Sequence, residues 1–457
     1  MSIEKEHRRL LVAVCTSLFF MPFMMAGVNA VLPAIAEDMQ CSARQLSMVG
    51  AFYALGLVVF QLAAGSLGDI YGRKRVFLWG MGIFSLTGAV LGFVASMPLF
   101  LALRFVQGMG GALFNASGLA LLASAAPPGL RAIYLGFSGS AVYAGIACGP
   151  PVAGFITGLL GWRWLFWGNA AAAILAFLLM KYSVNLEWRT ARDQPFDWAG
   201  CGIYAVAMTA LTFGATEMAL HPSLAWGLLA AFALLFALFC FKERGSRYPL
   251  MDVRLLARKP LFALSLLAAL VNYSAFFGLV FFFSLYLQVG RGMDVAHAGL
   301  FLSLQSVAQV VTTPLAARLC NVWDPGKVCA VGVGLCGIGL IAAAFLDIDV
   351  PLWWLLAAQI PLGAGISLFS LPNTSIILES AGPDHVGQAA GLTGAVRTGG
   401  NLFTMLLITI TLSLFFGHEP VSVENMHIFM RSMRADLAIF GLLNLAAVGC
   451  VLARNRR

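Results

Sequence analysis

The sequence has little charge and few acids. Of its 457 residues only 11% are charged, whereas 60% are hydrophobic, and Asp and Glu together number 20. Soluble domains carry about 25% charged and about 45–50% apolar residues. This composition therefore excludes an ordinary water-soluble domain and predicts an integral membrane protein that is embedded in the lipid bilayer.

Metal-binding and disulfide patterns are also missing. The nine cysteines lie mostly inside apolar runs, with no CxxC, and the six histidines are dispersed, so we predict no metal and no cofactor. A membrane enzyme should carry a carboxylate-rich metal motif or a clustered His/Ser site, and neither is present. A non-transporting receptor is not excluded by the sequence, although nothing in it favours one.

Long apolar runs dominate the chain, and runs of about 18–25 residues are long enough to span a bilayer. We identify fourteen, with boundaries uncertain by a few residues. They are 10–35, 46–68, 75–95, 98–124, 132–158, 163–181, 198–217, 223–241, 260–288, 298–317, 327–346, 351–376, 386–416 and 435–453.

The cations give an orientation. The net charge of +8 is spread over short loops rather than gathered on one segment, so no nucleic-acid partner is predicted. With fourteen spans both termini share one side, and most of the 28 lysines and arginines fall on that side, which makes it cytoplasmic. Opposite lie Arg44, Arg163, Arg291, Arg431 and Arg434, while Arg104 and Arg397 fall inside predicted spans.

The chain also repeats itself. The pattern Arg75-Val76-x-x-x-Gly80-x-Gly82 recurs at Lys327-Val328-x-x-x-Gly332-x-Gly334, and Gly108-x-Gly110 recurs at Gly363-x-Gly365, at nearly one offset. We therefore predict an all-α membrane protein of two six-helix bundles with two helices inserted between them. The predicted domains are 1–190, 191–259 and 260–457.

One loop combines glycines with charges of both signs. Residues Gly65–Arg75 hold four charges and three glycines; a cytoplasmic loop explains the cations, but not Asp69 or the glycine spacing. The order G-x-L-G-D-x-x-G-R-K-R resembles the signature loop of the major facilitator superfamily. The resemblance implies that fold and a cytoplasmic gate between two halves, formed by Gly65, Gly68, Asp69, Gly72, Arg73 and Arg75.

Two further stretches carry the same resemblance. An arginine inside a span costs at least about 2.5–3.5 kcal/mol, so a functional role for Arg104 is favoured over snorkelling. Its R-x-x-Q-G-x-G pattern resembles a family motif linked to proton transfer.

The glycines of the fifth run give a smooth, small-residue helix face, typical of tight packing. They resemble the antiporter pattern that packs between halves, with Gly145, Gly149, Pro150 and Gly154.

The order W-R-W-x-F-x-x-N at 162–169, together with fourteen helices, resembles the drug:proton antiporter-2 branch. That branch usually has an aspartate in the first helix, where this chain has Met24. This departure weakens the prediction that the substrates are lipophilic cations. It also leaves open which acid binds the coupled proton. We assign proton coupling to Asp69, Arg104 and Glu217, and note that Glu217 is as easily explained as a solvated helix-end charge.

Polar residues inside the spans are candidates for a central cavity, although for most of them an interhelical hydrogen bond is the favoured explanation. Arg397, a second buried cation without a nearby acid, suits an anionic substrate or a carboxylate partner. The candidates are Asn29, Gln61, Asn115, Asn272, Gln305, Gln309, Asn373, Arg397 and Asn401.

The sequence thus predicts a plasma-membrane transporter that exports drugs or other amphipathic small molecules in exchange for protons, by alternating access. A monomer is expected. The alternative is an exporter or facilitator of one endogenous metabolite or organic anion.

Overall fold

The computed structural model describes residues 2–454 except 126–130, 185–186, 188, 190–193, 219, 252, 348–349, 382–385 and 417–420. Within these residues fourteen helices are long and apolar enough to cross a membrane, which confirms the predicted number. The helices are α1 (Ser2–Ala30), α2 (Leu32–Met39), α3 (Ala43–Tyr71), α4 (Arg73–Leu91), α5 (Met97–Ala125), α6 (Arg131–Leu160), α7 (Arg163–Ser183), α8 (Trp198–Thr216), α9 (Pro222–Gly245), α10 (Val253–Arg258), α11 (Pro260–Leu285) with a π-helical turn η1 (Tyr286–Gly290), α12 (Val295–Val322), α13 (Pro325–Ala344), α14 (Trp353–Ala381), α15 (Val386–Phe416) and α16 (Met426–Arg454).

Two of the boundaries that differ from the predicted ones are informative. The first run ends at Ala30, and a separate short helix begins at Leu32 with Pro33 in its first turn. The last span begins at Met426 rather than at 435. Its first turns carry Arg431 and Arg434, which made them resemble a loop; Arg434 instead forms an ion pair with Asp347 at 2.6 Å.

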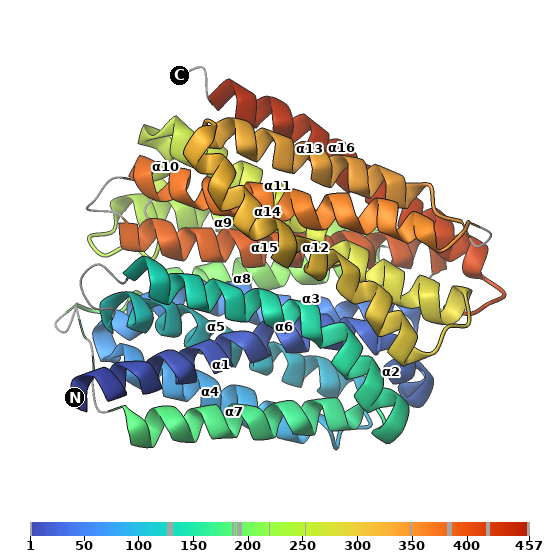
Figure 1. Cartoon of the computed structure of the whole chain (residues 1–457), viewed down its shortest axis with the longest axis horizontal. Helices are drawn as coiled ribbons and strands as arrows, with labels where there is room; N and C mark the ends of the chain where they lie inside the picture. Colours follow the sequence, from blue (N-terminus) through green and yellow to red (C-terminus); the bar gives the residue numbers. More distant parts are fainter. Residues whose placement is uncertain are drawn as a thin grey trace.

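The helices form two groups. Helices α1 and α3–α7 pack on one another, as do α11–α16, and α8 and α9 pack mainly on each other. In Figure 1 the first group lies below and the second above, with both chain ends at the left. We call the end of the molecule that holds both termini the terminal face and the opposite end the far face. The junction predicted at 190/191 lies outside the described residues.

The repeated glycines make equivalent contacts in the two groups. A Cβ on Gly80 of α4 would lie 2.7 Å from the carbonyl oxygen of Gly110 in α5. A Cβ on Gly332 of α13 would lie 2.6 Å from the carbonyl oxygen of Gly365 in α14. Real Cβ atoms do not approach so closely, so each pair needs glycine for its helices to touch. The sequence repeat thus corresponds to a repeated helix crossing.

Candidate functional site

The two groups touch along two seams that bring distant sequence segments together. In the first seam α3 runs antiparallel to α15. Ser47 and Thr409 share a hydrogen bond of 2.8 Å between their hydroxyls, and a Cβ on Gly50 would meet the sulfur of Met405 at 2.8 Å. Nearer the terminal face, Gln61 lies against Gly394. This seam is therefore closest-packed towards the far face.

The second seam joins α6 to α12. A Cβ on Gly154 would lie 2.3 Å from the carbonyl oxygen of Val295, and one on Gly299 would lie 2.4 Å from that of Pro150. The other two glycines predicted for this interface have a different partner, since Gly145 and Gly149 contact Phe19 and Phe23 of α1, within the first group. Only the far-face end of the predicted motif therefore reaches the second group.

A break in α1 supplies a third link at the far face. Proline has no backbone N–H, and its ring disfavours a continuous helix, so the chain turns at Val31 before Pro33. The carbonyl of Ala30 then accepts hydrogen bonds from Ser284 at 3.2 Å and from the Gln288 amide at 2.6 Å. Gln288 belongs to η1, and π-helical turns often occur at functional sites. All three links lie in the far-face half, so this conformation is closed there.

Between the seams a small polar cluster joins the two groups at mid-depth. The Tyr273 hydroxyl of α11 is 2.7 Å from the Ser370 hydroxyl of α14, which also lies 3.5 Å from the Tyr143 hydroxyl of α6. Arg397 of α15 is half-buried and within electrostatic range of Tyr273. Three of these residues were not predicted, because a serine or tyrosine in an apolar run is an unremarkable core residue from sequence.

The predicted cavity residues divide into two sets. Asn401 donates from its amide to the sulfur of Met25 across the groups at 3.3 Å, and Gln61 faces α15, so both lie at the interface with Arg397. Asn272 and Asn373 instead bind Asn444 and the Ser265 carbonyl within the second group. Asn29, Asn115, Gln305 and Gln309 are buried as well.

The side-chain amide of Gln305 has no partner within the described part of the chain. Gln305 lies where α12 meets α14 of the same group, because its backbone N–H donates to the side-chain oxygen of Gln359. Among the predicted cavity residues, Gln61 and Asn401 contact the other group and Arg397 lies near the tyrosine–serine cluster. Asn29, Asn115 and Gln309 stay predictions as cavity residues.

Arg104 lies inside the first group. Its side chain is 1% exposed, so it does not snorkel. The guanidinium sits 4.2 Å above the Tyr53 ring and donates to the Gln107 side chain at 2.6 Å. The described ion pairs include none to Arg104. Stacking on the ring and one charge-assisted hydrogen bond thus replace a carboxylate.

The loop between α3 and α4 is fixed by its own charges. Arg73 donates to Asp69 from Nε at 3.0 Å and from Nη2 at 2.7 Å, and its Nη1 donates to the Ala120 carbonyl of α5. Gly72 has φ of +108°, which favours glycine at the turn. The described contacts of Asp69 stay within the first group, while Arg75 and Gly65 are exposed.

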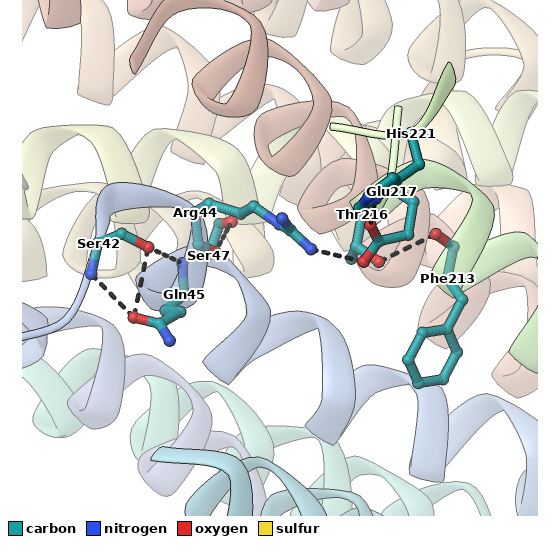
Figure 2. Close-up of polar contacts among 8 residues, drawn as sticks. All are labelled: Ser42, Arg44, Gln45, Ser47, Phe213, Thr216, Glu217 and His221. Atoms are coloured by element: carbon teal, nitrogen blue, oxygen red, sulfur yellow. Dashed lines mark hydrogen bonds and ion pairs between the residues drawn. The ribbon is translucent and has the colours of Figure 1, made fainter. Parts of the chain in front are cut away.

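Glu217 lies just beyond α8, at the far face and outside the span. Its carboxylate binds the Arg44 guanidinium at 2.7 Å and His221 at 3.0 Å, and Arg44 stands in the first turns of α3 (Figure 2). Burial tends to raise the pKa of Glu217, but the His221 hydrogen bond and the charge of Arg44 outweigh it, so this pKa lies below its usual value. The pair ties the inserted helices to the first group.

Breaking this tie should cost stability rather than function. We expect E217Q and R44Q each to remove about 1 kcal/mol, with no further loss in the double variant. Because the folded pKa is depressed, the contribution is present above the usual glutamate range and is lost as pH falls through the folded value. Melting temperatures of purified protein should therefore differ at neutral pH and converge at strongly acidic pH. Glu37, exposed at the same face, supplies the control E37Q; additive losses would contradict the pairing.

The sequence reasoning did not identify Asp436 as a buried acid. Asp436 in α16 is fully buried, with its carboxyl 2.6 Å from the Thr411 hydroxyl of α15. It escaped notice because the span was predicted to start at 435, next to two arginines, so that Asp436 looked like a helix-end charge. The signal available was its position before an uninterrupted apolar run.

Two helical groups that meet at two close-packed seams, with polar side chains between them, are typical of transporters that expose a central site alternately. A sequence model of the Major Facilitator Superfamily matches residues 14–405. The chain belongs to this superfamily.

Similar proteins match over most of the chain. The chain is 30% identical over 410 residues to the tetracenomycin C resistance and export protein of Streptomyces glaucescens, covering 87% of this chain and 74% of that protein. It is 29% identical over 404 residues to the multidrug resistance protein Stp of Mycobacterium tuberculosis, covering 86% and 74%. The crystal structure of a POT family transporter with a bound peptide conjugate superposes with a TM-score of 0.75 at 12% identity over 100% of this chain and 99% of that one, which is a likeness of fold alone.

Proposed function

We propose that the chain exports drugs or other amphipathic small molecules across the plasma membrane in exchange for protons, and that it works as a transporter rather than an enzyme. The observation that carries this proposal is the similarity, over most of both chains, to proteins named for antibiotic resistance and export. The interface between the groups, with Tyr143, Tyr273, Ser370 and Asn401, supplies the amphipathic surroundings that such substrates need.

The conformation supports alternating access. Hydrogen bonds and glycine contacts close the far face, whereas the gate residues at the terminal face are bonded within the first group. We place the terminal face in the cytoplasm, because the lysines and arginines concentrate there. In this orientation the structure is closed to the outside. We further propose domains at 1–190, 191–259 and 260–457, and a monomer as the transporting unit.

Proton exchange predicts a dependence on the pH gradient. Everted vesicles that contain the full chain should accumulate ethidium when the pH gradient is imposed and lose the accumulation when an ionophore dissipates it, because uphill export then has no driving force. Ethidium fluorescence gives the measurement, and vesicles without the protein give the control. Uphill accumulation that survives without the gradient would remove protons from the proposal.

The gate role of Asp69 leads to a second test. D69N removes the acceptor of two charge-assisted hydrogen bonds from Arg73 and should reduce ethidium export about tenfold or more while membrane insertion stays normal. Glu379, an exposed acid near the terminal end of α14, supplies the control E379Q. Export by D69N at the wild-type rate would exclude a gate at this loop.

A second candidate is an exporter of one organic anion. The observation that favours it is Arg397 at the interface, a half-buried cation for which the described ion pairs include no acid. Thermal stabilisation of the purified protein by a panel of organic anions but not by cationic dyes, lost in R397Q, would favour this candidate over drug export.

A further inference from the structure

One carboxyl group lies inside a membrane-spanning helix, where neither the predicted gate nor the helix-end ion pairs use it. Asp436 is 0% exposed. It stands ten residues after Met426, the first residue of α16, and therefore about 15 Å from the far end of that helix. Acids at such depth are rare in membrane proteins and mark proton or ion pathways.

Asp436 has one hydrogen-bonding neighbour and no cation in the part of the chain that is described. Its Oδ2 is 2.6 Å from the Thr411 hydroxyl, while its Oδ1 is buried without a partner. An ionised carboxylate in this position would keep one oxygen unsatisfied away from water, which is unfavourable. The neutral acid avoids this cost.

The charged and titratable groups around α16 do not offset a negative charge at Asp436. The packed elements are α11, η1, α13 and α15. Arg434 is bound to Asp347, Tyr286 to the Asp347 carbonyl and Tyr273 to Ser370. Arg397 precedes Thr411 by fourteen residues, or about 21 Å along α15. The remaining charged and titratable groups lie either nearer a helix end than Asp436 or closer to the terminal face. They are Lys327, Cys329, Cys336, His427 and Arg431.

The Thr411 hydroxyl has one hydrogen to donate, and this links its orientation to the protonation state of Asp436. Besides Asp436, the Thr411 oxygen lies 3.1 Å from the carbonyls of Leu407 and Ile408. A hydroxyl has one hydrogen and can accept others, and threonines within helices commonly donate to such carbonyls. If Thr411 does so, the hydrogen in its contact with Asp436 must come from the carboxyl. If Asp436 ionises, the hydroxyl has to turn away from its own helix.

A second buried polar group lies between Asp436 and the far end of α16. Ser432 lies one turn before Asp436, closer to the far end, and its buried hydroxyl has no partner among the described residues. A water molecule between this hydroxyl and the free Oδ1 would satisfy both groups.

We propose that Asp436, with Thr411, is the proton-binding site that couples export to the pH gradient, in place of the acid that Met24 does not supply. Water at the far face gives a proton to the carboxylate, and the carboxylic acid returns it to water on the terminal side; no other bond changes. The present conformation, closed at the far face, holds the protonated form. This inference rests on the proposed proton-coupled export.

The protonation state has a test that does not depend on transport. Infrared spectra of the purified full chain at neutral pH should show a carbonyl stretch of a protonated carboxylic acid in the wild type that is missing from D436N. E424Q removes an exposed acid just before α16 and should leave the band in place. A band of equal strength in wild type and D436N would overturn the proposal.

Coupling is tested in everted vesicles with ethidium. D436N should lose gradient-driven accumulation about tenfold or more, yet still exchange ethidium across the membrane without a gradient, and D436E should recover part of the accumulation. Accumulation by D436N at the wild-type level overturns the proposal. If the wild type itself accumulates no ethidium, drug export fails for this probe, while the infrared result still decides the proton site. If D436N does not insert into the membrane, T411V provides a second test. A change in the pH at which the infrared band disappears supports the pairing of Thr411 with Asp436, and an unchanged pH overturns it.

Discussion

Replacing Gly154 with leucine is expected to abolish export while the protein still folds and inserts. A Cβ at this position would lie 2.3 Å from the carbonyl oxygen of Val295 and 2.9 Å from its carbon, so α6 and α12 must separate before any side chain fits. Because the contact belongs to the far face, the expected result is a transporter that cannot close there. Ethidium export from energised cells should fall about tenfold or more, as expected when a conformational step is blocked.

The same helix provides a matched control. Gly158 lies one turn further along α6 and has open space where its Cβ would be, so G158L should export normally. Closure can be followed directly in a chain whose native cysteines are replaced. A298C, at a buried position beside Gly299 in α12, should react with an impermeant maleimide from outside in the G154L variant but not with G158L. Protection of A298C in both variants would contradict a far-face closure at this seam.

The second large effect is expected at Arg104. R104K keeps the positive charge, but an ammonium cannot lie flat on the Tyr53 ring while it donates to Gln107, as the guanidinium does. A buried cation that loses these contacts keeps its desolvation cost of about 2.5–3.5 kcal/mol or more. We expect R104K to lose most of its ethidium export and to melt at a lower temperature than the wild type.

Arg318, exposed near the terminal end of α12, gives the control R318K, which should behave as the wild type. The apolar variant R104M separates two roles of the arginine. If Arg104 only fills space, R104M should export better than R104K, because it removes the uncompensated charge. If the charge itself takes part in transport, R104M should be inactive even where its melting temperature is restored.

Much of the fold could be predicted because the bilayer acts on short segments of sequence. The length of an apolar run and the charge of its flanks decide whether it spans, and these rules located the spans without knowledge of their partners. They failed at Ala30, where Pro33 ends a helix inside an apolar run, and at Met426, where arginines belong to the helix. At Ala30 the proline sets the boundary, and at Met426 the ion pair of Arg434 with Asp347 lets charged turns belong to the helix; hydropathy reports neither.

The candidate site was less predictable, because its residues meet through packing between segments hundreds of positions apart. Nothing local distinguishes Gln61, which faces α15 at Gly394, from Asn272, which is bound to Asn444 within its own group. The glycines at 145 and 149 likewise look the same as that at 154, although they pack on α1. The sequence thus identified polar and small residues inside spans but could not assign them to the interface.

The inserted helices make the two sides of the molecule unequal. Helix α8 packs on α3 and also on α15, the pair that forms one of the two seams, whereas the inserted helices show no comparable packing on α6 or α12 among the described residues. A solute dissolved in the lipid would therefore find the α3–α15 seam covered by an inserted helix and the α6–α12 seam without such a cover. Lateral entry from the bilayer should be restricted to one flank of the protein.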